Sequence, residues 1–267
     1  MPPSSARTHP AVRGFDRAAE TYERGRPDYP AAAIDWLERA LGLGPGTIVV
    51  ELGSGTGKLT RLLARLRAAR IAVEPTAGMR RVFERTVPEV PVLDGTAEAI
   101  PLPDGFADAV VAAQAFHWFD PSRALPEIAR VLRPRGSVGM IWNLRDESVG
   151  WSRRFTEIIE PYRAASPGPR ADTAPTTRDP GWRRVIESPE SPFGPLHHRS
   201  FRYVQRAPRA TFVLRVLSVS VIAALPREDR RRVARRVREV MDSDPDTRGR
   251  RVLELPYRTD VYWARKR

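Results

Sequence analysis

Glu51 is followed by glycines at alternate positions, Gly53, Gly55 and Gly57, directly after the apolar run 48–50. The pattern predicts a buried strand that ends in a tight turn and leads into a helix. Glycine has no Cβ, so the backbone of such a turn can take positive φ angles and approach a ligand closely. The start of the helix adds unpaired N–H groups and the positive end of the helix dipole. These residues could bind a nucleotide-type ligand, or form a turn that binds nothing.

Two common nucleotide-binding loops fit this turn poorly. A phosphate-binding P-loop has a glycine five residues before its Gly-Lys pair and a Ser or Thr after it, whereas this chain has Leu52 and Leu59 at those positions. The dinucleotide fingerprint G-x-G-x-x-G places its third glycine where this chain has Lys58. The P-loop is therefore excluded, and an NAD or FAD site is disfavoured without being excluded.

Glu74 lies 23 residues after Glu51, at the end of the next predicted strand. An acid about 20 residues beyond a glycine turn is placed to accept hydrogen bonds from both ribose hydroxyls of a nucleotide. The alternative is an exposed loop carboxylate. The spacing favours the ribose contact.

His117 is the one histidine at a predicted strand end. Imidazole titrates near neutral pH, so His117 could act as a general base toward a neutral acceptor. It could equally pack against the ligand or donate one structural hydrogen bond, and a carboxylate acceptor would need no base. Trp118, Phe119 and Trp142 offer flat apolar walls nearby, although an ordinary core position is favoured for Trp142.

The elements that must position these residues alternate between strand and helix. The predicted strands are 47–52, 70–74, 90–93, 107–113, 137–142, 198–204 and 253–263. Predicted helices at 57–69 and 77–85 separate the first three strands, and one at 122–132 separates the fourth from the fifth. This alternation predicts an α/β fold with right-handed βαβ units and a sheet covered by helices on both faces. Ligands of such sheets bind at the carboxyl ends of the strands, where the glycine turn, Glu74, 94–98 and 114–119 all fall.

The two ends of the chain are expected to cover this sheet. Residues 1–12 are rich in Pro, Ser and Ala and are expected to be disordered. Residues 13–267 would form a single domain, in which 143–255 contribute an inserted cover. Within the N-terminal and C-terminal covers we expect a helix from 15 to before Pro27, helices at 31–41, 151–165, 211–225 and 227–241, and an irregular lid at 166–195.

Composition narrows the classes of function. The 267-residue chain carries a formal net charge of +13 and contains no cysteine, so disulfides and thiolate chemistry are excluded, and with four histidines we expect no metal site. Lysine occurs only at positions 58 and 266, so nearly all the positive charge is arginine. This composition favours a GC-rich coding bias, rather than a nucleic-acid-binding surface, as the origin of the positive charge. No apolar run reaches membrane length and the N-terminus lacks an apolar signal core, so we expect a cytoplasmic protein without membrane contact.

Four motifs together resemble the class I S-adenosylmethionine (SAM) methyltransferases of the methyltransferase-11 type. These motifs are Glu51–Gly57, Val73–Pro75, Gly95–Leu102 and Val131–Gly136. The segments that resemble the subgroup including trans-aconitate-methyltransferase-like proteins are Phe15–Pro30, Gln114–Phe119 and Leu255–Tyr262. The resemblance covers most of the chain. It implies a Rossmann-like, seven-stranded mixed sheet whose last strand, 257–263, is antiparallel, with SAM as methyl donor and S-adenosylhomocysteine as product.

The resemblance also implies roles for individual residues. Glu51 would hold the turn and face the amino group of SAM, Arg26 could pair with its carboxylate, and Glu74 would bind the ribose. Many relatives have Asp where this chain has Thr96, whose hydroxyl can still accept from the adenine amino group. The full cofactor set implied is Tyr22, Arg26, Glu51, Gly53, Ser54, Gly55, Gly57, Glu74, Pro75, Met79, Thr96, Ala97, Glu98, Gln114 and Ala115.

The substrate region is less specific. The residues assigned to it are Phe15, His117, Trp118, Phe119, Ser218 and Ser220. Relatives often have an aromatic residue after the second serine, where this chain has Val221, which would reshape the pocket. We expect methyl transfer to an oxygen of a small organic acid or hydroxylated metabolite. An RNA methyltransferase, suggested by the charge, and a SAM-binding protein without catalysis are the alternatives.

Overall fold

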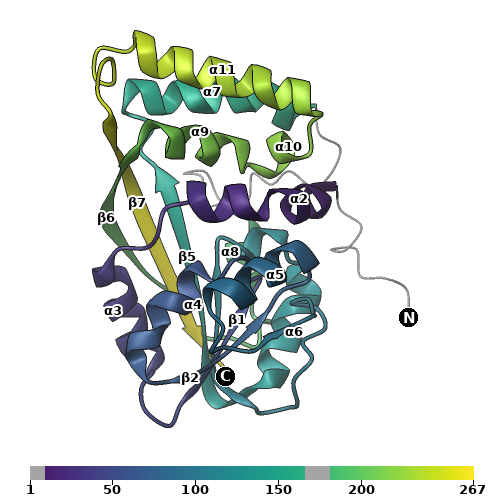
Figure 1. The fold of residues 1–267 in the computed structure, drawn as a ribbon. Coiled ribbons are helices and arrows are strands. Elements are labelled where there is room, and N and C mark those ends of the chain that lie inside the picture. Colours follow the sequence, from purple (N-terminus) through teal and green to yellow (C-terminus); the bar gives the residue numbers. More distant parts are fainter. Residues whose placement is uncertain (1–9, 166–180) are drawn as a thin grey trace.

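A seven-stranded sheet forms the centre of the fold (Figure 1) in this computed structural model, which describes residues 10–165 and 181–267. The strands are β1 (Ile48–Leu52), β2 (Ala69–Val73), β3 (Val92–Leu93), β4 (Ala107–Ala113), β5 (Leu132–Arg145), β6 (His197–Pro208) and β7 (Val252–Arg265). Their order is β3-β2-β1-β4-β5-β7-β6. β1 to β5 are parallel, and β7 is antiparallel to both β5 and β6. The predicted α/β fold with an antiparallel last strand is confirmed.

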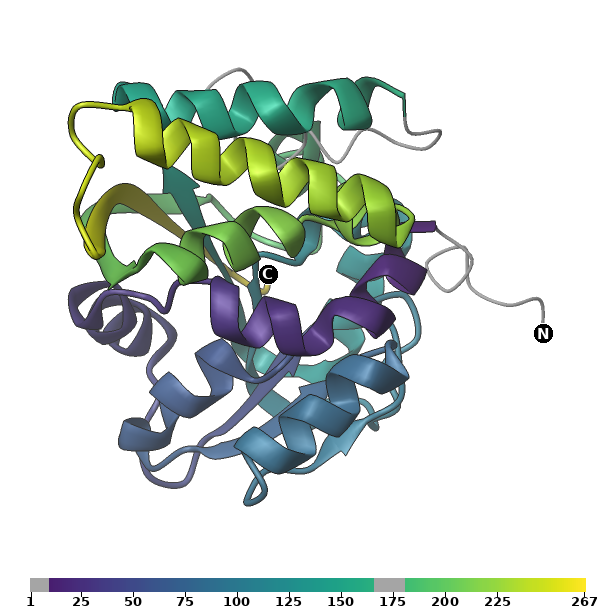
Figure 2. The same ribbon diagram turned by 45° about the horizontal axis from the view of Figure 1, so that its top comes forward.

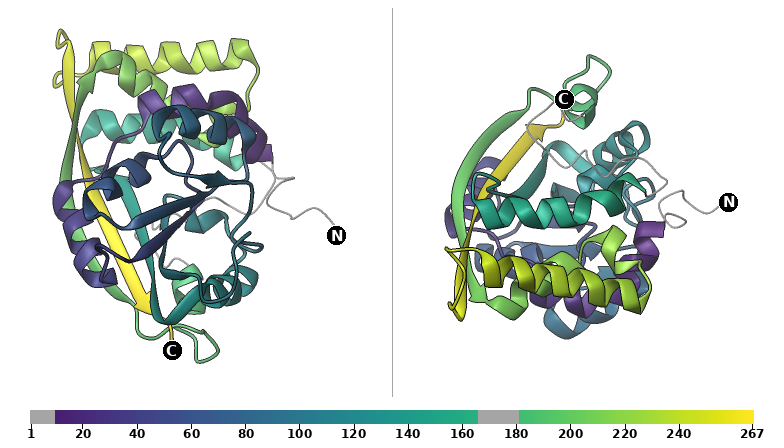
Figure 3. Two further views of the ribbon diagram at one scale, coloured as in Figure 1. Left: turned by 60° about the horizontal axis from the view of Figure 1, so that its bottom comes forward. Right: turned by 90° about the horizontal axis from the view of Figure 1, so that it is seen from above.

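Helices cover both faces of the sheet (Figure 3). They are α3 (Ala31–Leu41), α4 (Lys58–Leu62), α5 (Ala77–Thr86), α6 (Pro121–Val131) and α8 (Gly181–Ile186). Two neighbouring residues of β4, Val110 and Val111, are both fully buried but belong to opposite sides of the sheet: Val110 packs in the cluster of Leu125 from α6, and Val111 in the cluster of Leu59 from α4. A continuous apolar strand of this kind is expected where helices cover both faces.

A second helical layer lies beyond the carboxyl ends of the parallel strands (Figures 1 and 2). It consists of α7 (Gly150–Ala164), α9 (Arg209–Leu217), α10 (Ser220–Ala223) and α11 (Arg227–Ser243). Phe155, Phe212 and Val233 from three of these helices share one buried cluster with Leu255 of β7. No helix in the described part of the chain is long and apolar enough to cross a membrane.

Helix α2 (Pro10–Gly25) lies between the two layers (Figure 2). On one side Ala19 packs with Met79 and Val82 of α5, and on the other side α2 contacts α9 and α10. A Cβ at Gly25 would lie 2.6 Å from the backbone of Leu214, so α2 and α9 approach closely at that point. The N-terminal helix therefore connects the sheet to the helical cover.

Most predicted elements are present with shifted ends, but the helix predicted at 57–69 is shorter. It consists of α4 and a 3₁₀ turn, Leu63–Leu66, and the left-handed Arg67 (φ 55°) ends it. The helix α8 forms inside the segment predicted to be irregular, of which 166–180 lie outside the described residues. Helix α2 begins at Pro10, inside the segment predicted to be disordered, and residues 1–9 also lie outside the described part.

The predicted helix 211–225 is two helices, α9 and α10. The chain leaves the helical conformation at Val219, where ψ is 130°. At this break the carbonyl of Ser218 accepts a hydrogen bond from Nη2 of Arg26 at 3.1 Å. The break between α9 and α10 thus coincides with a contact to Arg26, which is far away in the sequence.

Candidate functional site

The turn after β1 is formed by glycines in the left-handed region of backbone space. The φ angle is 62° at Gly53, 57° at Gly55 and 85° at Gly57. A Cβ at Gly53 would lie 2.7 Å from the Cβ of Ala115, so the turn packs directly against the segment after β4. A Cβ at Gly55 would meet only the Tyr22 ring, 4.0 Å away. The predicted close approach is therefore available at Gly55, on the side of the turn that faces α2.

Glu74 is buried beside this turn, directly after β2. Its Oε2 accepts from the backbone N–H of Gly55 at 2.9 Å, and its Oε1 accepts from the backbone N–H of Thr76 at 2.9 Å. Burial raises the pKa of Glu74, while these two hydrogen bonds oppose the rise. Each carboxylate oxygen can accept a further bond. The exposed-loop alternative is wrong, because Glu74 is only 5% exposed and connects the second strand end to the glycine turn.

Glu51, at the end of β1, is the other buried acid of the site. Its Oε2 accepts from the Thr60 hydroxyl at 2.5 Å. Burial raises the pKa of Glu51 to about 8, and the negative charge of Glu74 adds to the rise. A neighbouring cation would lower this pKa by favouring the charged form. The arrangement is suited to binding a positively charged group.

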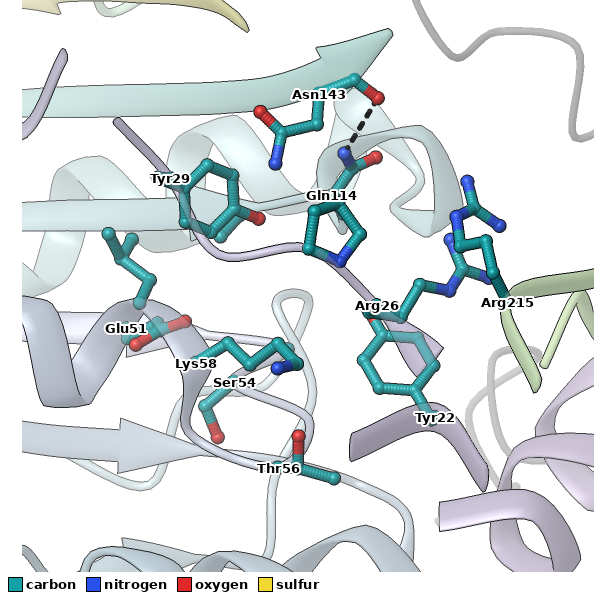
Figure 4. A pocket seen from close by; sticks show the side chains of 14 residues that line it. Tyr22, Arg26, Tyr29, Glu51, Ser54, Thr56, Lys58, Gln114, Asn143 and Arg215 are labelled. Atoms are coloured by element: carbon teal, nitrogen blue, oxygen red, sulfur yellow. Dashed lines mark hydrogen bonds between the residues drawn. The ribbon is translucent and has the colours of Figure 1, made fainter. Parts of the chain in front are cut away.

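A pocket opens between the glycine turn, the ends of β4 and β5, and helices α2 and α9 (Figure 4). Its labelled lining residues are Tyr22, Arg26, Tyr29, Glu51, Ser54, Thr56, Lys58, Gln114, Asn143 and Arg215. Five of the predicted cofactor residues thus share one cavity with Gly53. Gln114 has a φ of 54°, unusual for a residue with a side chain, and its Nε2 donates to the Asn143 carbonyl at 3.0 Å. Strained backbone of this kind is common in binding sites.

Helix α2 closes this pocket through two sets of polar contacts. Glu23 accepts from the Thr56 hydroxyl at 2.5 Å and from Arg61 at 2.8 Å, which ties α2 to the glycine turn. Arg26 donates from Nε to the hydroxyl of Ser218 at 3.0 Å and stacks over the Tyr22 ring at 4.7 Å. The predicted pair Tyr22 and Arg26 therefore lies over the site, and Ser218 anchors Arg26 to the helical cover.

Three buried polar atoms near the strand ends have no hydrogen-bond partner among the described residues: Ser54 Oγ, Thr96 Oγ1 and Glu98 Oε2. The other oxygen of Glu98 accepts from the Asp120 N–H at 2.9 Å. A buried polar group without a partner costs about 1–3 kcal/mol. These atoms fit a polar ligand that would pair with them, as SAM would with its amino and hydroxyl groups. Ala97 is buried between Thr96 and Glu98, and Met79 lies under α2.

His117 lies in a short 3₁₀ turn after β4, and its side chain is half-buried. Its Nδ1 accepts from Nε1 of Trp142 at 3.4 Å, which assigns the proton of the neutral ring to Nε2. Burial, together with the positive charges of Arg26 and Arg163, lowers the pKa of His117 to about 3. His117 is therefore neutral at physiological pH.

The remaining predicted substrate residues differ in their surroundings. Trp142 is fully buried and stacks on Trp182 with ring centroids 5.1 Å apart, so it belongs to the core. Trp118 and Phe119 are half-buried, and the Phe119 ring would lie 3.8 Å from a Cβ at Gly53. Ser220 is buried at the start of α10. The side chain of Phe15 lies outside the described part of the chain, and Pro75 is half-buried between Glu74 and Thr76.

The sequence predictions missed Tyr29, Lys58, Asn143 and Arg215 as lining residues of the pocket. Asn143 follows Trp142 at a predicted strand end, so its position could have been used. Arg215 interrupts the apolar run 212–225, which was the available signal for it. Tyr29 and Lys58 gave no signal that separates them from ordinary surface residues. Among the described residues, no group of three His, Asp or Glu side chains could hold a metal ion.

Comparison with known proteins identifies the family of the chain. Residues 50–140, from β1 into β5, match the family model described as a methyltransferase domain. An uncharacterized methyltransferase of Mycobacterium tuberculosis (strain ATCC 25618 / H37Rv) is 39% identical over 245 residues, which are 92% of each chain. An uncharacterized methyltransferase-like protein of Schizosaccharomyces pombe is 31% identical over 256 residues, 96% of each chain.

Solved structures share the fold. A structure from Anaeromyxobacter dehalogenans, provisionally described as a type II methyltransferase, has a TM-score of 0.63 and 24% identity and covers 90% of this chain and 97% of its own. The YcgJ protein of Bacillus subtilis has a TM-score of 0.54 and 16% identity, with 88% and 98% covered. Together with the relatives that align along nearly the whole sequence, these findings show that the chain belongs to the class I SAM-dependent methyltransferases.

Proposed function

We propose that this methyltransferase transfers the methyl group of SAM to an oxygen of a small organic acid or hydroxylated metabolite. The observation that supports a small acceptor is the position of the pocket. It lies between the glycine turn and two helices, α2 and α9, which are joined across it by the bonds from Arg26 to Ser218. An acceptor must fit inside this enclosure.

Bound SAM supplies a methyl group already activated on a sulfonium, so the protein's task is to align the reactants and exclude water. Glu51 would bind the amino group of the cofactor, since burial raises its pKa and a cation beside it would stabilise the charged form. The hydroxyls of Ser54 and Thr96 would gain the hydrogen-bond partners that they lack. Glu74, already fixed by Gly55 and Thr76, would accept from the ribose hydroxyls with its remaining lone pairs.

The state of His117 favours an acid as the acceptor. With burial and two nearby arginines, the ring has a pKa too low for a general base. A carboxylate needs no base, because it is already a nucleophile. The resemblance of residues 15–30 and 114–119 to the trans-aconitate-methyltransferase-like subgroup supports the same class of acceptor.

The basic helix α11, which suggested an RNA substrate, packs against α7 and α9 on the side away from α2 (Figure 1). Part of its charge is paired, since Arg232 contacts Asp229 at 3.1 Å. Nothing in this arrangement directs RNA to the pocket, and we do not propose RNA as the acceptor.

The test is transfer of label from methyl-labelled SAM. The protein is incubated with a panel of carboxylic acids, with the same acids as amides, and with total RNA at low salt. We expect labelled products from acids and none from the amides. Label in RNA alone would refute the proposal, and SAM binding by calorimetry without transfer to any sample would favour the non-catalytic alternative.

A further inference from the structure

Two arginines line the pocket, and a third, Arg145, lies on β5 two residues beyond the lining residue Asn143. Arg26 follows α2, Arg215 lies on α9, and Arg145 ends β5. Arg26 and Arg215 both line the pocket, and Figure 4 shows their guanidinium groups together beside Tyr22. The positive charge of Arg215 contributes to lowering the pKa of both Arg26 and Arg145, after burial as the main cause, so Arg215 lies close enough to repel each of them.

These arginines have no acidic partner within ion-pair distance among the described residues. Within residues 10–165 and 181–267, Arg26 donates only to the hydroxyl and carbonyl of Ser218, and Arg145 donates from Nη2 to the Thr156 hydroxyl at 2.7 Å. In addition, Nη1 of Arg145 and Nε of Arg215 are buried and make no hydrogen bond within the described part of the chain. Lys58 in the same pocket differs, because Asp28 at 3.4 Å and Glu23 at 3.8 Å offset its charge.

The other charged and titratable groups near the arginines do not neutralise them. Arg163 adds a further positive charge beside Arg145, and the acid that favours the charged form of Arg145, Glu147, is exposed. Tyr22, Tyr29 and Tyr257 face Arg26, and a neutral phenol carries no charge to offset it. Gathering unpaired guanidinium groups out of water is costly, and an anion with several oxygens would satisfy both their charge and their donors.

The cofactor alone does not satisfy three guanidinium groups. The one carboxylate of SAM is predicted to pair with Arg26, and its ammonium and sulfonium add positive charge, so Arg145 and Arg215 are left for a second anion. We propose that Arg145 and Arg215, with Arg26 beside them, form a subsite for an oxyanion group of the methyl acceptor, either a carboxylate or a phosphate. The proposal deepens the proposed function and rests on it in one respect, that the bound anion belongs to the acceptor.

Anion binding can be tested without turnover. The Tm of the protein is measured with increasing concentrations of succinate or inorganic phosphate. Sodium chloride at equal ionic strength serves as the salt control. The same measurement is made on the variants Arg145→Gln and Arg215→Gln and on a matched control, Arg236→Gln. Arg236 is an exposed arginine on α11. We expect a saturable rise in Tm with at least one probe for wild type and R236Q, and an affinity at least tenfold weaker for R145Q and R215Q. The probe that acts distinguishes a carboxylate subsite from a phosphate subsite.

Two further readouts separate the subsite from a structural role. Without added anion, R215Q should melt above wild type, because the substitution removes like-charge repulsion. Its SAM affinity by calorimetry should not fall. If R215Q does not fold, Arg215→Lys keeps the charge without the planar donor fork and should bind the probe at least threefold more weakly than wild type.

Equal Tm shifts in wild type, R145Q and R215Q would overturn the subsite, as would no shift with either probe. Failure of the proposed function would give a different result from failure of the subsite. In that case the arginines would still bind the anion, while labelled SAM would transfer no methyl group to any acid. Transfer to acids with an unchanged KM in R215Q would instead reject the subsite and leave the proposed function standing.

Discussion

The buried carboxyl of Glu51 makes stability depend on pH in a direction opposite to that of a salt-bridged acid. Its pKa is raised from 4.5 to about 8, so the folded protein holds the proton more tightly than the unfolded chain does. As pH rises above 4.5 the unfolded chain loses this proton first, and the free energy of unfolding falls until the folded protein also loses it near pH 8. At 1.36 kcal/mol per pH unit, the loss is on the order of 5 kcal/mol.

The substitution Glu51→Gln isolates this effect. Glutamine has the same shape, and its carbonyl oxygen can still accept from the Thr60 hydroxyl that now bonds to Oε2 of Glu51. The variant should match wild type at pH 4.5 to within about 1 kcal/mol and be increasingly more stable toward pH 8, by several kcal/mol. Comparing the two proteins cancels the contribution of Glu74, whose pKa is also raised.

The assay is urea unfolding at intervals between pH 4.5 and 8.5, with Glu190→Gln as control. Glu190 is exposed, so its substitution should leave the wild-type pH profile unchanged. Parallel profiles for wild type and E51Q between pH 5 and 8 would refute the reasoning, because they would mean that Glu51 ionises in the folded protein as easily as in the unfolded chain.

Three further outcomes follow from the site. Glu74→Ala removes a charged hydrogen-bond acceptor, about 1.5–3 kcal/mol, and should weaken SAM binding by tenfold or more in calorimetry; unchanged affinity would disprove the placement of the ribose. Gly53→Ala should lower the free energy of unfolding by about 1–3 kcal/mol, and by more than Gly105→Ala, which has a similar φ but no atom within 4 Å; equal losses would show that the contact with Ala115 does not matter. His117→Gln should leave the pH dependence of methyl transfer between pH 5.5 and 8 as it is in wild type, since the pKa of His117 is about 3, and loss of an inflection in that range would restore its role as a base.

Local sequence patterns were sufficient for the sheet and for the glycine turn after β1. The apolar run of β4 and the alternate glycines after β1 depend on residues close together in the chain, and each was predicted within a few residues of its observed position. Glu74 could be placed at the second strand end, but its bond to the Gly55 N–H could not, because that contact joins two loops.

The contact between Arg26 and the helical cover could not be predicted, for a physical reason. Arg26 and Ser218 are separated by 192 positions, and no periodicity relates them. The break between α9 and α10 occurs at this contact, so a helical pattern alone gave one continuous helix. The core position of Trp142, by contrast, could be predicted. It lies on an apolar strand, and a core position was the favoured interpretation; in the structure it packs against Trp182 and Tyr262.

The position of β7 constrains the order in which the molecule can assemble. β7 is the last strand along the chain, yet it lies inside the sheet, with β5 on one side and β6 on the other. Until β7 is added, both of those strands have an unpaired edge, and β6 has no partner in the sheet. During synthesis β7 leaves the ribosome after β5 and β6, so the parallel strands can pair before β6 is joined to the sheet. Over that interval the nascent chain exposes strand edges that can pair with other chains, and a chaperone that shields them would act at this stage.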